Sequence, residues 1–295
     1  MEFKSGFIAL VGSPNVGKST LLNALIGTKI AIVSKKPQTT RNRITGVLTR
    51  EDYQMIFVDT PGLQTPKNKL GEFMLKTAEQ TARDVDAVLF IADAKVGVRE
   101  KDTEILERLC KGTVPLVFAL NKIDAVDAER IDEQETILKQ YGKDVFRISA
   151  TEKIGLSELV EHLKQYMSEG PMYYPADMVS DQPESVIAAE LIREKALKSI
   201  GKEIPHGIGV AVEKLERETE RELINIEATI YCEKDSHKGI IIGAGGRMLK
   251  KIASAAREDM EQLLDSKVYL QVWVKVKPDW RNKISVMQTL GYRDN

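Results

Sequence analysis

Residues 12–19 constrain the fold of this 295-residue chain more than any other segment. They read Gly-Ser-Pro-Asn-Val-Gly-Lys-Ser, which fits the pattern G-x-x-x-x-G-K-[ST]. The apolar run 7–12 that leads into them is typical of a buried strand, and a helix is expected to follow. A glycine-rich loop between a strand and a helix predicts the first unit of an α/β domain built on a parallel sheet.

The chemistry of this loop is suited to phosphate groups. Backbone N–H groups of the loop and of the helix N-terminus cradle phosphate oxygens, Lys18 adds a positive charge, and the Ser19 hydroxyl can ligate Mg²⁺. A glycine-rich turn without a ligand is the alternative, and the flanking strand and helix argue against it. The residues expected to contact the nucleotide here are Gly12, Asn15, Val16, Gly17, Lys18, Ser19 and Thr20.

Further apolar runs at 55–59, 87–92 and 114–120 alternate with polar segments of helical periodicity, for example 99–111, 127–141 and 155–168. Strands and helices that alternate at this spacing predict a mostly parallel sheet with helices on both faces. The motif Asp59-Thr-Pro-Gly62 ends one of these strands. It places a carboxylate near the magnesium ion and a glycine amide where a γ-phosphate can accept a hydrogen bond.

Two more motifs indicate that the base is guanine. Asn121-Lys122-Ile-Asp124 follows a later strand, and a carboxylate such as Asp124 can accept from two guanine donors that adenine lacks. Ser149-Ala150 closes the segment 143–149, where a backbone amide can donate to the guanine oxygen. Each motif alone also fits a turn or a helix cap, but in this order at strand ends they predict a nucleotide crevice.

With these motifs, residues 5–168 resemble a translation-factor-type GTPase domain. The resemblance implies that a threonine in the loop 28–43 ligates Mg²⁺ in the triphosphate state, and we choose Thr40, with Thr39 as its competitor. The expected metal ligands are therefore Ser19, Thr40 and Asp59, and the expected catalytic residues are Asn15, Lys18, Thr40 and Gly62.

The residue after Gly62 departs from many GTPases, because Leu63 stands where a glutamine commonly orients the attacking water. The chain resembles the subgroup with a hydrophobic residue there, in which Asn15 helps to hold a potassium ion. We therefore expect slow intrinsic hydrolysis that K⁺ or a partner stimulates. Arg41 and Arg43 are candidate arginine fingers, although exposed loop charges are the favoured interpretation.

The character of the chain changes after residue 170, where Gly170, Pro171, Pro175 and Pro183 interrupt regular structure. The strands expected near 224–232 and 268–276 alternate apolar and polar residues, which predicts one covered face and one open face. Apolar positions between 249 and 263 recur at helical spacing and would supply the cover. The second domain is therefore expected to be α+β.

The loop Gly243-Ala-Gly-Gly246 lies between an apolar stretch and the amphipathic helix. This is the layout of a KH module, whose G-x-x-G loop clamps a nucleic-acid backbone, and the order of elements fits the type II arrangement. A glycine-rich turn is the alternative. No basic residue stands between the end glycines, so we expect somewhat weaker non-specific binding. The residues expected to contact RNA are Gly243, Ala244, Gly245, Gly246, Arg247, Lys250 and Lys251.

A GTPase domain followed by a type II KH domain resembles the Era ribosome-assembly GTPases over essentially the whole chain. The resemblance implies a GTP- and GDP-binding switch that uses Mg²⁺, with K⁺ as a further candidate. It also implies binding near the 3′ end of small-subunit 16S ribosomal RNA and assistance to 30S subunit assembly and rRNA maturation. The alternative is an RNA-binding chaperone whose nucleotide site mainly senses GTP and GDP.

The expected boundaries are 1–172 for the GTPase domain, 173–183 for a linker, 184–277 for the KH domain and 278–295 for a C-terminal tail. The net charge of −1 excludes a polybasic coat protein, but residues 236–295 carry a local excess of five positive charges. Two distant cysteines are expected to be buried free thiols, and no signal peptide is recognised. We expect a cytoplasmic monomer, and the resemblance adds peripheral association with the inner face of the cell membrane.

Overall fold

The computed structural model describes residues 2–34, 39–63, 65–200, 204, 207–218 and 222–292. The chain divides into two compact units, each described by itself below. The first unit consists of Met1–Ala31, Thr40–Thr65 and Met74–Asp181. The second consists of Ile32–Thr39, Pro66–Phe73 and Gln182–Asn295, so two short segments from the first third of the chain belong to the unit built by its last third.

The first unit has the predicted mostly parallel sheet. Its strand order is β2-β3-β1-β4-β5-β6, with β2 antiparallel to β3 and the short β7 antiparallel to the start of β1. Two elements were not predicted from the sequence. One is β2, whose apolar residues are separated by Thr45 and Gly46, and the other is α2. The elements are β1 (Lys4–Val11), α1 (Lys18–Ile26), β2 (Ile44–Thr49), β3 (Tyr53–Asp59), α2 (Lys69–Thr81, of which the residues up to Phe73 belong to the second unit), β4 (Ala87–Asp93), α3 (Glu100–Leu109), β5 (Leu116–Asn121), α4 (Ala128–Leu138), β6 (Val145–Arg147), α5 (Leu156–Leu163) and β7 (Ser168–Glu169).

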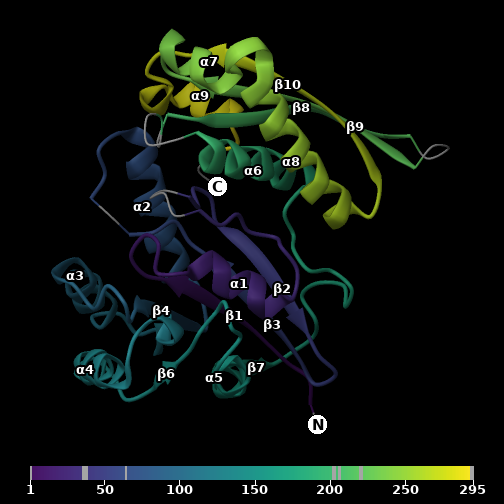
Figure 1. Cartoon of the computed structure of the whole chain (residues 1–295). Coiled ribbons are helices and arrows are strands. Elements are labelled where there is room, and N and C mark those ends of the chain that lie inside the picture. The colour runs from purple at the N-terminus through teal and green to yellow at the C-terminus, as the bar shows by residue number, and fades with distance from the viewer. Residues whose placement is uncertain are drawn as a thin grey trace. The chain divides into compact units, whose positions relative to one another are not determined.

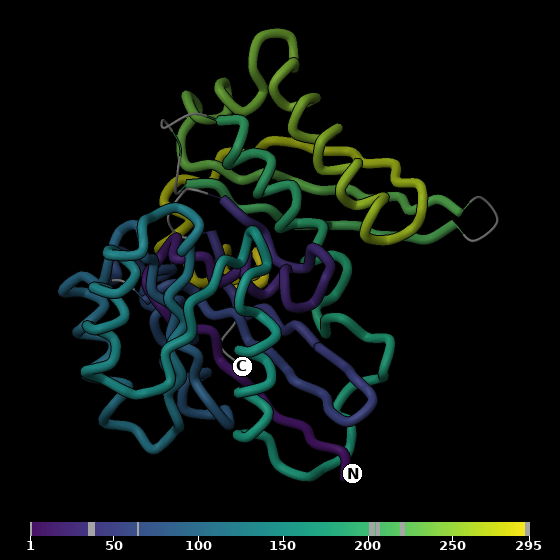
Figure 2. Tube along the Cα trace, turned by 60° about the horizontal axis from the view of Figure 1, so that its bottom comes forward, coloured from purple at the N-terminus to yellow at the C-terminus, as the bar shows by residue number. Residues whose placement is uncertain are grey.

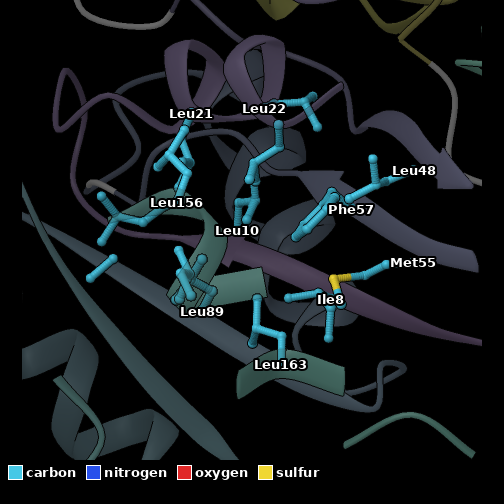
Figure 3. Packing of buried hydrophobic residues seen from close by; sticks show 14 of the residues in the cluster. Ile8, Leu10, Leu21, Leu22, Leu48, Met55, Phe57, Leu89, Leu156 and Leu163 are labelled. Atoms are coloured by element: carbon cyan, nitrogen blue, oxygen red, sulfur yellow. The ribbon is translucent and has the colours of Figure 1, made fainter. Parts of the chain in front are cut away.

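Helices cover both faces of this sheet, as the continuous apolar strands predicted. On one face, α1 and α5 pack on residues of β1, β3 and β4, and Figure 3 shows Leu22, Leu156 and Leu163 around Ile8 and Leu10. On the other face, Leu106 of α3 and Leu138 of α4 pack against Phe90 and Phe118. Burial on both faces leaves the strand ends as the place where polar side chains gather.

The segment predicted as a linker is hydrogen-bonded along β2 and β3. The Val47 amide donates to the Val179 carbonyl at 2.9 Å, and the Gln54 side chain bonds the backbone of Tyr173 and Tyr174. Proline and glycine therefore end regular structure here without releasing the chain from the first unit.

The second unit is a three-stranded sheet of order β10-β9-β8, in which β8 and β9 are antiparallel and β9 and β10 parallel. Its helices α6 and α8 lie side by side on one face of the sheet (Figures 1 and 2). The predicted alternation holds for the first half of β9, where Ile224, Ile226 and Ala228 are buried on the covered face, but in the second half Thr229 and Tyr231 of the other face are buried as well. The elements are α6 (Glu184–Ser199), β8 (Gly209–Glu218), β9 (Leu223–Cys232), α7 (Asp235–Ile242), α8 (Arg247–Leu264), β10 (Lys267–Val276) and α9 (Ile284–Thr289).

The residues predicted as a C-terminal tail are folded up to Tyr292. A 3₁₀ turn at Trp280–Asn282 precedes α9, and the Trp280 ring is fully buried with its Nε1–H donating to the Gly207 carbonyl at 2.9 Å. The Tyr292 ring stacks on that indole. In the sequence, Trp280 is a single large aromatic residue within a polar segment, and this was the signal that could have predicted its burial.

The expectation that both cysteines are buried is wrong for Cys110, which is exposed at the end of α3, and right for Cys232. Neither belongs to a disulfide. Among the described residues, no helix combines the length and the apolar character that a membrane span requires.

Candidate functional site

The phosphate loop joins the end of β1 to the start of α1, as its sequence predicted. Gly12 has φ 153°, and a Cβ atom there would lie 2.4 Å from the Ile91 carbonyl oxygen, so only glycine fits. Helix α1 begins at Lys18, and its N-cap residue Gly17 supplies no side-chain cap. The first-turn amides of α1 therefore offer donors that an anion can accept.

Lys18 is buried inside this loop. Its Nζ donates to the carbonyl oxygens of Gly12 and Ser13 at 3.0 and 3.1 Å. Burial lowers the pKa of Lys18 to about 8, although the charge of Asp59 opposes the shift. The loop thus holds a costly ammonium group where a phosphate would neutralise it.

Three oxygen-bearing side chains meet beside Lys18. The Ser19 Oγ lies 2.8 Å from Thr40 Oγ1 and 2.6 Å from Asp59 Oδ2, and Thr40 Oγ1 lies 3.3 Å from the same carboxylate oxygen. Burial raises the pKa of Asp59 to about 6, and its Oδ1 atom accepts no hydrogen bond from any described residue. Hydroxyl and carboxylate oxygens with one oxygen unsatisfied fit a hard divalent cation such as Mg²⁺.

The structure separates the two candidate threonines of the loop before β2. Thr40 is buried against Ser19 and Asp59, whereas the Thr39 hydroxyl donates to the Ser34 carbonyl at 3.5 Å. This geometry favours Thr40 as the magnesium ligand. Gln38, which precedes the two threonines, lies outside the described residues. The expected exposure of the two arginines holds for Arg43 and is wrong for Arg41, which is 1% exposed.

Gly62 and Leu63 lie against the phosphate loop. A Cβ atom on Gly62 would come within 2.9 Å of the Pro14 nitrogen, and the Leu63 amide donates to the Gly12 carbonyl at 3.4 Å. The Leu63 side chain packs on the apolar cluster that contains Leu106. Leucine at this position serves packing, and its side chain has no group that can orient water.

The Asn121 side chain is hydrogen-bonded to the phosphate loop, to its own motif and to the loop at Ser149-Ala150. Its Nδ2 donates to the Val16 carbonyl at 2.9 Å, while its Oδ1 accepts from the amides of Lys122 and Ala150 at 2.9 and 3.0 Å. The side chain is 2% exposed. Asn121 and the Ala150 amide therefore bond to the protein itself and connect the guanine motif to the loop at Ser149-Ala150.

The other base-side residues differ in their surroundings. Asp124 is exposed in a 3₁₀ turn, with no hydrogen bond to any part of the chain that the structure describes. Ser149 is fully buried, and its Oγ accepts from the Glu152 amide at 3.1 Å. Lys122 Nζ donates to the Asn15 carbonyl at 2.7 Å and to Asp93 Oδ2 at 2.5 Å. Sequence reasoning missed Asp93, which no motif marks.

The second candidate loop connects α7 to α8 in the other unit. Gly243 has φ 69° and ψ 173°, and a Cβ atom there would lie 2.7 Å from Met248 Cβ. A Cβ atom on Gly245 or Gly246 would meet nothing within 4 Å, so their backbone faces open space. Arg247 Nε donates back to the Ala244 carbonyl at 3.2 Å.

Helix α8 begins at Arg247, and no side chain of its N-cap residue, Gly246, occupies the first-turn amides. The three basic residues predicted near this loop, Arg247, Lys250 and Lys251, are all exposed on the first turns of α8. Open amides and exposed cations are the groups that contact a phosphodiester backbone.

Comparisons with known proteins identify the family of each domain. A family model described as 50S ribosome-binding GTPase matches residues 7–122, and a KH domain model matches residues 203–281. The GTPase Era of Alkaliphilus oremlandii (strain OhILAs) is 51% identical over 294 residues, which cover 99% of this chain and 100% of that protein. The GTPase Era of Clostridium kluyveri (strain NBRC 12016) is 52% identical over 295 residues, covering 98% of this chain and 99% of that protein.

Solved structures extend the likeness to the fold. A crystal structure of Era in complex with MgGDPNP and nucleotides 1506–1542 of 16S ribosomal RNA has a TM-score of 0.95 at 38% identity, covering 99% of this chain and 100% of that one. A point variant of Aquifex aeolicus Era bound to GDP·AlF₄⁻ has a TM-score of 0.93 at 38% identity, with the same coverage.

Proposed function

Because this chain belongs to the GTPase Era family and is a GTPase, we propose that it is a GTP-dependent switch that binds small-subunit ribosomal RNA near its 3′ end. In this role it assists maturation of that RNA and assembly of the 30S subunit. The observation that carries the proposal is one chain holding both a buried phosphate site and an open G-x-x-G loop. The solved Era structure with MgGDPNP and a 16S segment supports the choice of ligands.

The nucleotide site stabilises the charge of a triphosphate. The first-turn amides of α1 and the Lys18 ammonium bind phosphate oxygens, and Asp124 accepts from the guanine edge. Ser19, Thr40 and Asp59 would hold Mg²⁺, which when bound neutralises charge on the phosphates. Gly62 approaches the phosphate loop closely enough for its amide to donate to a terminal phosphate.

Hydrolysis is expected to be slow without a stimulating cation, because Leu63 supplies no hydrogen-bonding group for water. Asn15 is exposed on the phosphate loop and carries a side-chain oxygen suited to K⁺. The test compares GTP turnover in K⁺ and Na⁺ for the wild type and Asn15→Asp. We expect K⁺ to stimulate the wild type and the two cations to act alike on the variant; equal rates throughout would remove Asn15 from this role.

RNA is assigned to the residues of the α7–α8 loop, Gly243, Ala244, Gly245 and Gly246, with Arg247, Lys250 and Lys251. Backbone amides carry most of the contact here, since Ala244 replaces a basic residue. Residues 236–295 contain 11 basic and 6 acidic side chains, which is the local positive excess that a phosphate backbone requires.

The proposed switch has a physical connection within the second unit. Val33 donates its amide to Glu194 Oε1 at 2.9 Å, and the fully buried Arg193 donates through Nη2 to the Thr39 carbonyl. Thr39 is joined by a peptide bond to Thr40, the proposed magnesium ligand. Thr40 is therefore connected to Arg193 of α6 through one peptide bond and the hydrogen bond of Thr39.

The test is RNA affinity measured with a GTP analogue and with GDP. A switch predicts different affinities in the two states, and Arg193→Gln should shrink the difference while leaving the affinity in the GDP state unchanged. Equal affinities in the wild type would favour the RNA chaperone with a sensor site.

We also propose the boundaries given above, namely a GTPase domain over 1–172, a linker over 173–183 and a KH domain over 184–277, in a monomer. We place the protein in the cytoplasm with peripheral association at the inner face of the cell membrane. Co-sedimentation with anionic and neutral vesicles tests the membrane part; no binding to either composition would remove it.

A further inference from the structure

Asp93 is a buried carboxylate that none of the nucleotide motifs includes. It ends β4 and is 6% exposed. One oxygen, Oδ1, accepts from the amides of Lys95 and Val96 at 2.9 and 3.2 Å, while Oδ2 accepts from Lys122 Nζ at 2.5 Å. Both oxygens are therefore engaged, one with the loop after β4 and one with the guanine motif.

Lys122, the partner of Asp93, also contacts the phosphate loop. Its Nζ donates to the Asn15 carbonyl at 2.7 Å, so one ammonium bridges Asp93 and Asn15. Asn15 and Lys122 both have φ 68°, a left-handed backbone that side chains other than glycine adopt only at some cost. Such conformations persist where neighbouring contacts hold them.

We propose that Asp93 is a positioning residue for nucleotide binding and for the K⁺ response. The charge of Asp93 keeps Lys122 extended toward the Asn15 peptide, and this link holds the phosphate loop and the guanine loop at a set separation. The K⁺ part rests on the proposed function, which gives Asn15 the cation. The role of Asp93 in nucleotide binding rests only on the requirement that the phosphate loop and the guanine loop bind the same nucleotide.

The experiment replaces Asp93 with asparagine in the full-length protein. The amide oxygen of Asp93→Asn can still accept from Lys95 and Val96, while an NH₂ group replaces the charged acceptor that faces Lys122, so the variant removes the ion pair and keeps the turn. We expect GDP to dissociate about tenfold faster and GTP turnover to require a higher K⁺ concentration for half-maximal stimulation. RNA affinity in the GDP state should not change.

Asp86→Asn is the matched control. Asp86 precedes the same strand at its other end, where its Oδ2 accepts from the Phe7 amide at 2.7 Å, far from both loops in the order of the strand. We expect its GDP dissociation and K⁺ response to equal those of the wild type. If Asp93→Asn does not fold, Asp93→Ser is measured in its place, because a hydroxyl can still accept one of the two amide bonds.

A double-mutant cycle with Lys122→Met decides whether Asp93 acts through Lys122. In the Lys122→Met background, Asp93→Asn should change GDP dissociation by no more than about twofold. Full additivity of the two substitutions would overturn the proposal, as would wild-type dissociation and K⁺ response in Asp93→Asn. A wild type that ignores K⁺ would refute the role given to Asn15, and GDP dissociation would then decide the role of Asp93.

Discussion

The two glycine-rich loops of this protein, residues 12–17 and 243–246, both present backbone amides at the start of a helix, but the first is enclosed and the second is open. Each precedes a helix whose N-cap is a glycine in the left-handed conformation, Gly17 before α1 and Gly246 before α8. The first loop encloses the buried Lys18 and is tied down by Asn121 and Lys122. The second has open space around Gly245 and Gly246, and its basic neighbours are exposed.

This difference indicates what each loop can recognise. Buried charges in the first loop cost free energy until a phosphate and a cation of matching charge arrive, so the site favours one defined ligand. The second loop offers backbone donors and exposed basic side chains, which suit any phosphodiester backbone and whose contacts weaken as the salt concentration rises. The phosphate site is thus built around buried charges, whereas the proposed guanine acceptor Asp124 and the proposed RNA loop lie at the surface.

Lys18→Ala should produce the largest effect, and it should weaken nucleotide binding while leaving RNA binding unchanged. Removing a buried cation from a phosphate site is expected to weaken GTP binding by on the order of 10²–10³-fold. RNA affinity in the absence of nucleotide should stay the same. Fluorescent GDP titration and RNA filter binding measure the two, with Lys111→Ala, an exposed lysine beyond α3, as the control. Tight GTP binding by Lys18→Ala would contradict the phosphate assignment.

Gly243→Ala is the corresponding test of the open loop. Alanine would be strained at φ 69° and ψ 173°, and its Cβ would collide with Met248 Cβ. We expect RNA affinity to fall about tenfold, a cost of roughly 1–3 kcal/mol, with GTP turnover unchanged. Gly239→Ala in α7 is the matched control, since a Cβ there meets nothing within 4 Å. Equal RNA affinity in both variants would show that this loop does not carry the contact.

The pH dependence should also distinguish the loops. Burial lowers the pKa of Lys18 to about 8, so the free protein loses this charge as pH rises through 8 and retains it at pH 7. Bound phosphate favours the charged form, and GTP affinity should therefore fall up to about tenfold between pH 7 and pH 9. Calorimetric titration over this range measures it. A GTP affinity that stays constant to pH 9, or RNA affinity that falls in parallel, would contradict the prediction.

Ala244→Lys should give the smallest effect, and it is a gain. A lysine between the end glycines adds one phosphate contact, so RNA affinity should rise about threefold and the salt dependence should steepen by about 0.7 in log–log slope. Gln262→Lys adds the same charge to an exposed position near the other end of α8. An equal gain in the control would mean that net charge alone, and not the loop, determines the affinity.

Much of the nucleotide site could be predicted because its motifs are local in sequence and fall at the ends of strands. Lys18, Ser19, Asp59 and Asn121 lie where those motifs placed them. Asp93 could not be predicted, because its partner Lys122 follows 29 residues later and no spacing rule connects the two. The burial of Arg41 was missed for a related reason, since exposure of a loop residue depends on which surface the loop folds against.

The sequence alone determined the class of each domain and the positions of its glycine-rich loops, because periodicity and motif spacing act over a few residues. Only the tertiary structure decided that residues 32–39 and 66–73 belong to the second unit, that Tyr292 packs on Trp280, and that Asp93 pairs with Lys122. These features depend on contacts between segments distant along the chain. Their stability comes from burial and hydrogen-bond satisfaction, which local sequence does not encode.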